Sequence, residues 1–345
     1  MEKTKTYIES ITRDISDGLI LIDKAGNILY ANPSACRLLA NDSLNQGITF
    51  DEFMKSDVSG KNGEFRQFVL DSLSDKKRTD SGHVSYTCHD GTRRTIRMTK
   101  SSAAVEGKPE PLGVILQLAD VTEQRRKETR YTDAVKILVA IIFLLATWDF
   151  ACVIWDMLGK PIAASTMTVI IEVLGLIGTV FALRYTSVTP ADFGLGTKNL
   201  KASLRFDLIL TAAILVLMIG AKLVILKFFP DVFGSDTRLF YWDKWSRSMT
   251  FYPLTVLIQE FLTRGATQGS LEKVLPENYP PWVAVIISSV FFGALHVHRG
   301  LAYMIGATVL LSFFGFVYNK QRTIWGLCIP HYFLGISLTL IWGFA

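Results

Sequence analysis

Ionisable and amide side chains stand in three otherwise apolar stretches near the C-terminal end of the chain. "IQEFLTRG" carries Gln259, Glu260 and Arg264, "FFGALHVH" carries His296, and "CIPHYFLGI" carries His331. A charged side chain at the centre of a membrane helix costs about 2.5–3.5 kcal/mol, so such groups are usually paired or functional. If these side chains met around one water molecule, they could supply the base and the oxyanion donors that peptide hydrolysis needs.

The spacing of these residues also allows purely structural roles. Glu260 and Arg264 are four residues apart on one helix face, which predicts an ion pair that could simply hold a helix bundle together. Gln259 binds water but has no protonation equilibrium near neutral pH, so it cannot act as a base. His331, as a lone buried histidine, could equally be a packing residue.

Phe292 and His296 are four residues apart, so a helix would place the ring one turn below the imidazole on the same face. His298 would point roughly 200° away if that helix continued. We therefore expect His296 to face the interior, and His298 with Arg299 to form an interfacial cluster. The other ionisable residues within apolar segments are Asp149, Glu172 and Lys222.

Seven apolar segments have the length of on the order of 20 residues that a bilayer crossing requires. The predicted spans lie near 137–157, 161–184, 207–229, 248–268, 282–298, 301–318 and 323–345. A short or re-entrant eighth segment also fits the pattern. Residues 137–345 are thus expected to form an all-α polytopic membrane bundle of about 7–8 transmembrane helices.

The flanking sequence predicts a multi-pass protein of the cell membrane with its N-terminal domain in the cytoplasm. "MEKTKTYIES" is too polar for a signal peptide, and the basic "EQRRKETR" precedes the first span. The net charge of +5 comes from clusters near span ends, which indicates contact with the lipid bilayer rather than with nucleic acid. The four scattered cysteines indicate neither a disulfide framework nor a zinc site.

Residues 1 to about 131 carry most of the charge, and residues 1–122 have the pattern of an α+β domain with a five-stranded antiparallel sheet and short helices. Residues 19–22 and 28–30 alternate around a Gly-Asn turn, as in a β-hairpin. Asn32 and Pro33 suit the start of a helix. "HVSYTC", "RRTIRMT" and "GVILQLAD" supply the three later strands.

With "DGLILIDKAGNILYANPSA" early and "DVTEQRRKE" at its exit, this domain resembles a PAS sensor domain over roughly residues 8–122. The resemblance implies a sensing role, with haem, flavin or a metabolite as an unidentified ligand, and a homodimer through this domain by analogy. No flavin-photosensor cysteine motif occurs. His83 and His89 are haem-ligand candidates, although a solvated histidine is the simpler interpretation of each.

Residues 123–136 are expected to form a helical signalling linker. No Gly or Pro occurs from Val114 through Leu158, so nothing breaks a helix that continues from about Val121 into the first span. Such a helix could transmit a twist or tilt from the sensor, or it could merely be a solvated tether.

"QEFLTR", "FGALH" and "HYFLG" occur in the order of the three motifs of the CAAX prenyl endopeptidase and bacteriocin-processing (CPBP, or ABI) intramembrane protease family. "PADFGLGTKNL" is similar to a stretch upstream of that family's core, and the resemblance covers about residues 160–345. It implies a membrane-embedded endopeptidase that cleaves a peptide or membrane-protein substrate under control of the cytoplasmic sensor.

The resemblance assigns catalytic positions to Glu260, Arg264, His296 and His331, with Gln259 at the place of the family's first glutamate. Phe292 matches the family's phenylalanine, and Gly335 stands where the family has an asparagine; both are expected on the substrate-binding side. In the family the first glutamate and first histidine are thought to activate water, while the last histidine and asparagine stabilise the oxyanion. Here one member of each pair is missing.

Three hypotheses follow: a working protease with an adapted site, a catalytically silent relative that binds transmembrane or lipidated peptides, and a sensor whose bundle is only an anchor. His296 alone could serve as the base. A zinc site built from Glu260, His296 and His331 is a less favoured alternative, because three protein ligands plus water can form catalytic zinc sites but no HExxH-type spacing is present.

Overall fold

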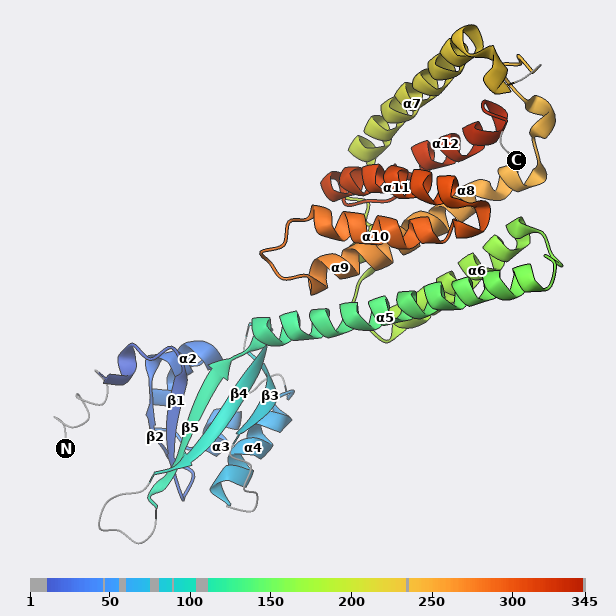
Figure 1. The fold of residues 1–345 in the computed structure, drawn as a ribbon. Coiled ribbons are helices and arrows are strands. Elements are labelled where there is room, and N and C mark those ends of the chain that lie inside the picture. Colours follow the sequence, from blue (N-terminus) through green and yellow to red (C-terminus); the bar gives the residue numbers. More distant parts are fainter. Residues whose placement is uncertain are drawn as a thin grey trace. The chain divides into compact units, whose positions relative to one another are not determined.

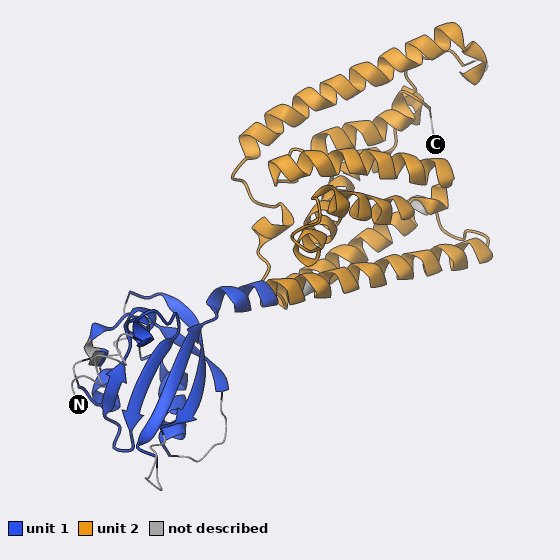
Figure 2. Ribbon diagram, turned by 60° about the vertical axis from the view of Figure 1, so that its left-hand side comes forward, with its two compact units in different colours: residues 1–128 blue, residues 129–345 orange. Residues whose placement is uncertain are grey.

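The computed structural model describes residues 11–45, 47–55, 60–74, 81–88, 90–103, 111–233 and 236–343. The chain divides into two compact units, Met1–Glu128 and Thr129–Ala345 (Figure 2). Each unit has its own buried core, and each is described separately below.

The first unit contains a five-stranded antiparallel sheet, as the sequence predicts, and its strand order is β2-β1-β5-β4-β3 (Figure 1). Helices and a short 3-10 turn lie between β2 and β3. The elements are β1 (Gly18–Asp23), β2 (Ile28–Ala31), α2 (Pro33–Leu39), η1 (Asp42–Asn45), α3 (Phe50–Lys55), α4 (Gly63–Leu73), β3 (Ser81–Thr87), β4 (Arg93–Ser102) and β5 (Gly113–Asp120).

Asn32 joins the first hairpin to α2, because it caps the helix while bonding to the strand beside it. Its side-chain oxygen accepts from the backbone N–H groups of Ala35 and Leu19, each at 2.9 Å. Its amide nitrogen donates to the backbone oxygen of Asp17 at 3.0 Å. The predicted cap, with Pro33 as the first helical residue, is therefore confirmed.

Asn32→Ala is expected to destabilise the β1–α2 region by about 1–2 kcal/mol, because it removes a helix cap and leaves buried amides unpaired. Hydrogen exchange of the full-length protein should show faster exchange in residues 18–39. Gln67→Ala, which removes an exposed side-chain bond to Asp71, is the matched control and should leave the exchange unchanged. Equal protection in both variants would contradict the proposed role of Asn32.

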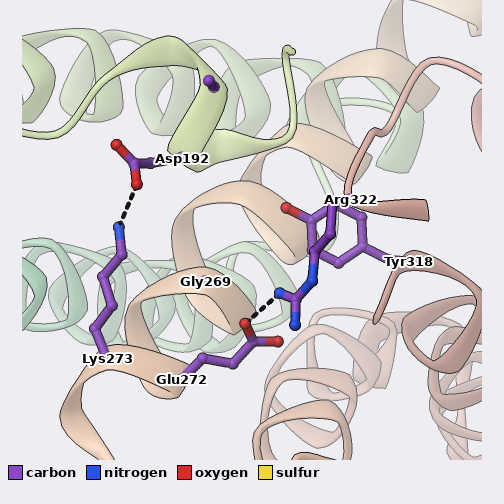
Figure 3. A pocket seen from close by; sticks show the side chains of 7 residues that line it. Asp192, Gly269, Glu272, Lys273, Tyr318 and Arg322 are labelled. Atoms are coloured by element: carbon purple, nitrogen blue, oxygen red, sulfur yellow. Dashed lines mark hydrogen bonds and ion pairs between the residues drawn. The ribbon is translucent and has the colours of Figure 1, made fainter. Parts of the chain in front are cut away.

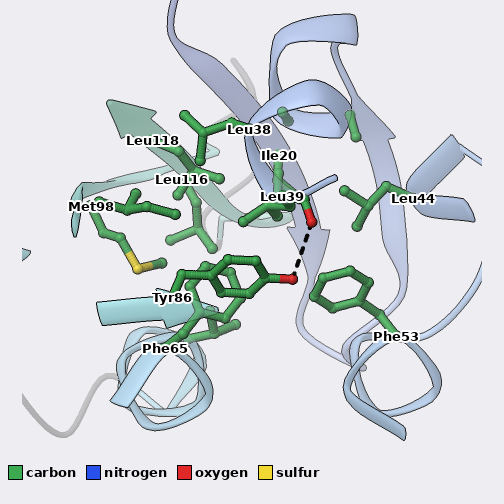
Figure 4. Packing of buried hydrophobic residues seen from close by; sticks show 14 of the residues in the cluster. Ile20, Leu38, Leu39, Leu44, Phe53, Phe65, Tyr86, Met98, Leu116 and Leu118 are labelled. Carbon is green, nitrogen blue, oxygen red and sulfur yellow. Dashed lines mark hydrogen bonds between the residues drawn. The ribbon is translucent and has the colours of Figure 1, made fainter. Parts of the chain in front are cut away.

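The core of the first unit lies between the sheet and its helices (Figure 4). Phe65 of α4 packs edge-on against Tyr86 of β3, with ring centroids 5.1 Å apart. Leu116 and Leu118 of β5 are buried on the same side of their strand, as the period of two in "GVILQLAD" requires. The helices thus cover the apolar face that the alternating strands present.

The second unit is helical. Its elements are α5 (Thr122–Met157, beginning in the first unit), α6 (Ala164–Arg184), η2 (Pro190–Phe193), α7 (Leu200–Phe228), η3 (Pro230–Phe233), η4 (Trp242–Lys244), α8 (Arg247–Glu260), η5 (Phe261–Gln268), α9 (Gly269–Val274), α10 (Trp282–Ala294), η6 (Val297–Arg299), α11 (Leu301–Gln321) and α12 (Cys328–Leu340). Within the described ranges, α5, α7 and α11 are long and apolar enough to cross a membrane, and α6, α10 and α12 contain shorter apolar helices.

Two predicted spans are shorter in the structure than in the sequence analysis. Within the described residues 323–343 of the predicted span 323–345, the helix covers only Cys328–Leu340, because Arg322 adopts a left-handed conformation and Ile324 N–H bonds to Gly194 O at 2.9 Å. The segment 282–298 is helical only to Ala294. The predicted unbroken helix through the linker is confirmed, since α5 continues from Thr122 to Met157.

Lys222 explains one intramembrane charge that the sequence leaves open. Its side chain is fully buried in α7, and its ammonium donates to the backbone oxygens of Leu239, at 3.3 Å, and Ile341. The same nitrogen lies 4.2 Å from the ring centroid of Tyr241. Lys222 therefore holds the segments around Leu239 and Ile341 against α7, which is a structural role.

Candidate functional site

The segment that carries the first polar motif is not a single α-helix. α8 ends at Glu260, a π-helix occupies Phe261–Gln268, and α9 continues from Gly269. The Thr267 hydroxyl donates to Leu262 O five residues earlier, at 2.9 Å. A π-helical stretch inside a helix often marks a functional site, and here it lies directly beside Glu260.

Glu260 is the centre of a fully buried charged cluster. Its Oε1 lies 2.7 Å from His331 Nδ1 on α12, and its Oε2 lies 3.4 Å from Arg264 Nε. Both Glu260 and Arg264 have no exposed surface. The predicted ion pair is confirmed, and the structure adds His331 as the second partner of the carboxylate.

Arg264 extends this cluster into a ladder of polar residues spaced four apart along the segment. Its guanidinium donates to Gln268 Oε1 at 3.1 Å and to the backbone oxygen of Leu311. Gln268 in turn donates to Asn319 Oδ1 at 2.7 Å and to Glu272 Oε1 at 3.2 Å. Arg264 is thus committed to neighbours on α11 as well as to Glu260, which makes it a structural and charge-balancing residue.

Gln259 brings a second carboxylate to the same end of α8. Its amide donates to Glu172 Oε1 on α6 at 2.7 Å, and Thr255, one turn earlier, lies close to the Glu172 side chain. Glu172 is only 7% exposed. Sequence analysis recognised Glu172 as an intramembrane acid but gave it no role, because the contact joins residues 87 positions apart.

Gly335 lies against an aromatic side chain from α8. A Cβ atom placed on Gly335 would lie 2.5 Å from both the hydroxyl and the Cε1 of Tyr252, so an asparagine could not occupy this position without displacing the ring. Tyr252 also contacts Tyr332, with ring centroids 6.0 Å apart. The phenol hydroxyl therefore fills the space one helical turn beyond His331.

His296 differs from its predicted setting, because α10 ends before it. His296 lies in the turn after the helix, with Nδ1 3.1 Å from Phe292 O, and it interacts electrostatically with His331. His298 lies in the turn before α11, as expected; its ring packs edge-on against Trp148 at 5.3 Å, and its Nδ1 lies 2.9 Å from Leu295 O. Arg299 is exposed and lies over Tyr303. Phe292 is buried in the bundle core.

The structure does not assemble the zinc site that was the less favoured alternative. Glu260 and His331 meet, but within the described ranges no three His, Cys, Asp or Glu side chains are placed to hold a metal ion together. The contact between Glu260 and His331 is a hydrogen bond between acid and imidazole.

A separate cavity of about 340 Å³ lies at the end of the polar ladder (Figure 3). Lys273 lies 3.3 Å from Asp192, and Arg322 pairs with Glu272 across the cavity wall. Tyr318 also lines it. Both cations that line this cavity are balanced by carboxylates, so the cavity itself is close to neutral.

Asp192 gives the helical unit a pH-dependent contact outside the spans. Burial raises the pKa of its carboxyl, but the hydrogen bonds from Thr189 and the Lys273 ammonium outweigh burial, so the pKa lies below its ordinary value. A carboxyl with a lowered folded-state pKa stabilises the protein above its unfolded-state pKa, and this stabilisation is lost as pH falls through the folded-state pKa.

Asp192→Asn is therefore expected to lower the Tm of the detergent-solubilised protein at pH 7, with the difference from wild type shrinking towards about pH 3. Thermal unfolding at both pH values measures this difference. Asp231→Asn, at an exposed position in η3, should have little effect at either pH. A difference that does not depend on pH would show that the Asp192 charge is unimportant.

In the first unit, His83 fits the interpretation of a solvated histidine. It is exposed on β3, and its Nδ1 lies 3.0 Å from the Arg125 guanidinium. His89 lies outside the described residues. Cys36 and Cys88 are buried, and burial raises the pKa of both thiols, which disfavours the reactive thiolate form.

Two family descriptions match the chain. Residues 12–126 match the PAS fold, and residues 241–336 match the type II CAAX prenyl endopeptidase Rce1-like family. The second match includes all the motif residues named above, from Gln259 to Gly335. The chain therefore contains a PAS domain followed by an Rce1-like CAAX prenyl endopeptidase (CPBP) domain.

Solved PAS-domain structures resemble the first unit. The PAS domain of a Colwellia psychrerythraea protein is 15% identical, covering 34% of this chain and 98% of that one, with a TM-score of 0.27. The PAS domain of an HTR-like protein from Haloarcula marismortui is 20% identical, covering 34% and 93%, with a TM-score of 0.26. The Bordetella pertussis BvgS PAS domain is 17% identical, covering 36% and 90%, with a TM-score of 0.29. A comparison with curated proteins gave no match.

Proposed function

We propose that the second unit is a membrane-embedded endopeptidase of the CPBP type, which cleaves a peptide or membrane-protein substrate. In this proposal all seven predicted segments cross the bilayer. The observation that carries it is the buried contact of 2.7 Å between His331 Nδ1 and Glu260 Oε1. This contact brings the first and third motifs together, although they are 71 residues apart in the chain.

The arrangement suits hydrolysis because the charged residues divide their tasks. Glu260, held by Arg264, accepts a hydrogen bond from Nδ1–H of His331 and fixes the orientation of the ring. When the ring is in its imidazolium form, Nε2–H is free to donate to a developing oxyanion. His296, just beyond α10, acts on the attacking water. Glu260 itself is a positioning residue, since Oε1 is hydrogen-bonded to His331 and Oε2 is ion-paired with Arg264.

The proposal is tested with the full-length protein in detergent and in proteoliposomes, using quenched-fluorescent transmembrane and prenylated peptides as substrates. His296→Ala is expected to reduce kcat/KM by at least about 10²-fold, because a misplaced attacking water can cost about this factor. His298→Ala removes a neighbouring histidine that packs on Trp148 and should retain activity. Cleavage that His296→Ala leaves unchanged would refute the mechanism.

A second function, a catalytically silent relative that binds membrane peptides, is favoured by the identity of two residues. Gln259 cannot take a proton, and Gly335 has no donor side chain. The discriminating variant is Gln259→Glu. Activity that appears only in this variant would establish that the wild-type protein is catalytically silent.

The PAS domain is proposed to lie in the cytoplasm and to control the membrane unit through α5, with a homodimer as the signalling form. The uninterrupted α5 helix supports this coupling. Insertion of two glycines after Arg126 should uncouple the units, because glycine disfavours helix. The measurement is the protease or peptide-binding output of the full-length protein with and without the insertion, and an unchanged output would refute helical coupling.

A further inference from the structure

The buried end of α8 contains two carboxylates in different electrostatic settings. Glu260 has a guanidinium and an imidazole as partners. Glu172 bonds to the neutral side chain of Gln259 and lies close to that of Thr255, and no Lys or Arg pairs with it among the side chains that the structure describes. Of the two acids, Glu172 is therefore the one whose lone pairs are not held by a fixed positive charge.

Gln259 gives Glu172 a defined position. The amide donates to Glu172 Oε1 at 2.7 Å. The carboxylate of Glu172, on α6, therefore lies one hydrogen bond away from the place that the carboxylate of a glutamate at position 259 would occupy. The site therefore still contains a carboxylate beside position 259, but it belongs to Glu172. Position 259 needs to be an amide for this contact, because a second carboxylate would repel Glu172.

Tyr252 relates to Gly335 in a similar way. Tyr252, Thr255 and Gln259 lie on one face of α8, at intervals of three and four residues. The phenol hydroxyl lies where a side chain at position 335 would begin, 2.5 Å from an ideal Cβ. Gly335 and His331 are four residues apart on α12, so the Tyr252 hydroxyl and the His331 imidazole lie on the same face of this helix.

We propose that Glu172 is the catalytic base and Tyr252 the second oxyanion donor of the peptidase site, which together replace the groups that Gln259 and Gly335 do not supply. This inference rests on the proposed endopeptidase function. Glu172 lies outside the residues matched by the endopeptidase family, 241–336, so its role comes from the contacts of this chain alone.

In the reaction, the Glu172 carboxylate takes a proton from a water molecule that His296 helps to orient. The water oxygen bonds to the scissile carbonyl carbon, and the C=O π electrons move to the oxygen. That oxyanion accepts hydrogen bonds from the Tyr252 hydroxyl and the His331 imidazolium. The C–N bond then breaks, and the proton on Glu172 passes to the departing amine, which leaves a carboxylic acid and an amine as products.

The experiment compares conservative variants of the full-length protein with exchange variants. Glu172→Gln preserves volume and an oxygen acceptor for the Gln259 amide but removes the base, so kcat should fall by about 10²-fold or more. Tyr252→Phe should lower kcat by about 10²–10³-fold. Asp149→Asn, at an exposed intramembrane acid on α5, is the matched control and should retain wild-type kcat.

Exchange variants separate chemistry from packing. Glu172→Gln combined with Gln259→Glu moves the carboxylate back to α8 and should recover most of the lost rate. Tyr252→Ala combined with Gly335→Asn replaces the phenol by an amide in the same space and should recover activity relative to Tyr252→Phe. In the Glu172→Gln single variant, the acidic limb of the kcat/KM pH profile should disappear.

Each outcome decides between the two levels of the proposal. Full activity of Glu172→Gln or Tyr252→Phe, beside an inactive His296→Ala, would overturn this inference and leave the endopeptidase function standing. Loss of activity in Glu172→Gln that the exchange does not restore would show a packing role and also overturn it. A wild-type protein inactive on every substrate, with Gln259→Glu active, would overturn both.

Discussion

Arg264→Leu is expected to destabilise the helical unit by about 3–5 kcal/mol, the largest stability effect of any single substitution considered for this chain. Removing one partner of a buried ion pair leaves the other charge without compensation. Here Glu260 has no exposed surface, and Gln268 Oε1 and Leu311 O each lose a donor. Thermal unfolding in detergent, with the fraction of monodisperse protein after heating, measures the loss.

Arg322→Leu is the matched control, because it removes an arginine that is half-exposed and paired with Glu272. Ion pairs at a surface contribute about 0–1 kcal/mol, so its Tm should stay close to that of wild type. Arg264→Lys should fall between the two, since it keeps the charge but loses the planar donor group. Equal effects of Arg264→Leu and Arg322→Leu would show that the buried cluster contributes no special stability.

His331→Ala is expected to reduce kcat by about 10²–10³-fold in the proposed endopeptidase, the factor associated with one oxyanion donor. The same change leaves Glu260 Oε1 without its partner at 2.7 Å, which adds a stability loss of about 1–3 kcal/mol. Steady-state kinetics at a temperature well below the variant's Tm separates the two effects.

Ser337→Ala, at a buried position on the same α12 helix, serves as the control for that measurement. It should leave kcat unchanged, because Ser337 belongs to none of the three family motifs. A His331→Ala protein that is folded and cleaves at the wild-type rate would remove His331 from the mechanism, while its contact with Glu260 would remain a structural one.

Local contacts in this chain were predictable from sequence because their geometry is set within one or two turns. Asn32 before Pro33 indicates a capped helix, and the spacing of Glu260 and Arg264 indicates an ion pair; the structure contains both. The strand pattern likewise predicts the five-stranded sheet. In each of these cases the partners are close in sequence or follow a fixed period.

The contacts that complete the candidate site were not predictable in the same way. The bond between Gln259 and Glu172, and the packing of Tyr252 on Gly335, depend on which helices are neighbours. An apolar helix with one glutamate, Glu172, was the available signal, but its partner required the tertiary structure. The end of α10 at Ala294, before His296 and His298, was not predictable either, since it is not marked by proline or a charged cap.

The eight-residue π-helix at Phe261–Gln268 has a further consequence for the tolerance of this segment to length changes. A π-turn accommodates about one residue more than an α-turn, so the segment behaves as an α-helix with an inserted residue. Deleting a residue such as Ala266 would remove the extra residue, so the segment could relax to regular α geometry while the residues beyond it keep their orientation. Gln268 and Glu272 would then still face α11, whereas inserting a residue would turn them by roughly 100°, so chains of this type should tolerate a one-residue deletion here far better than an insertion.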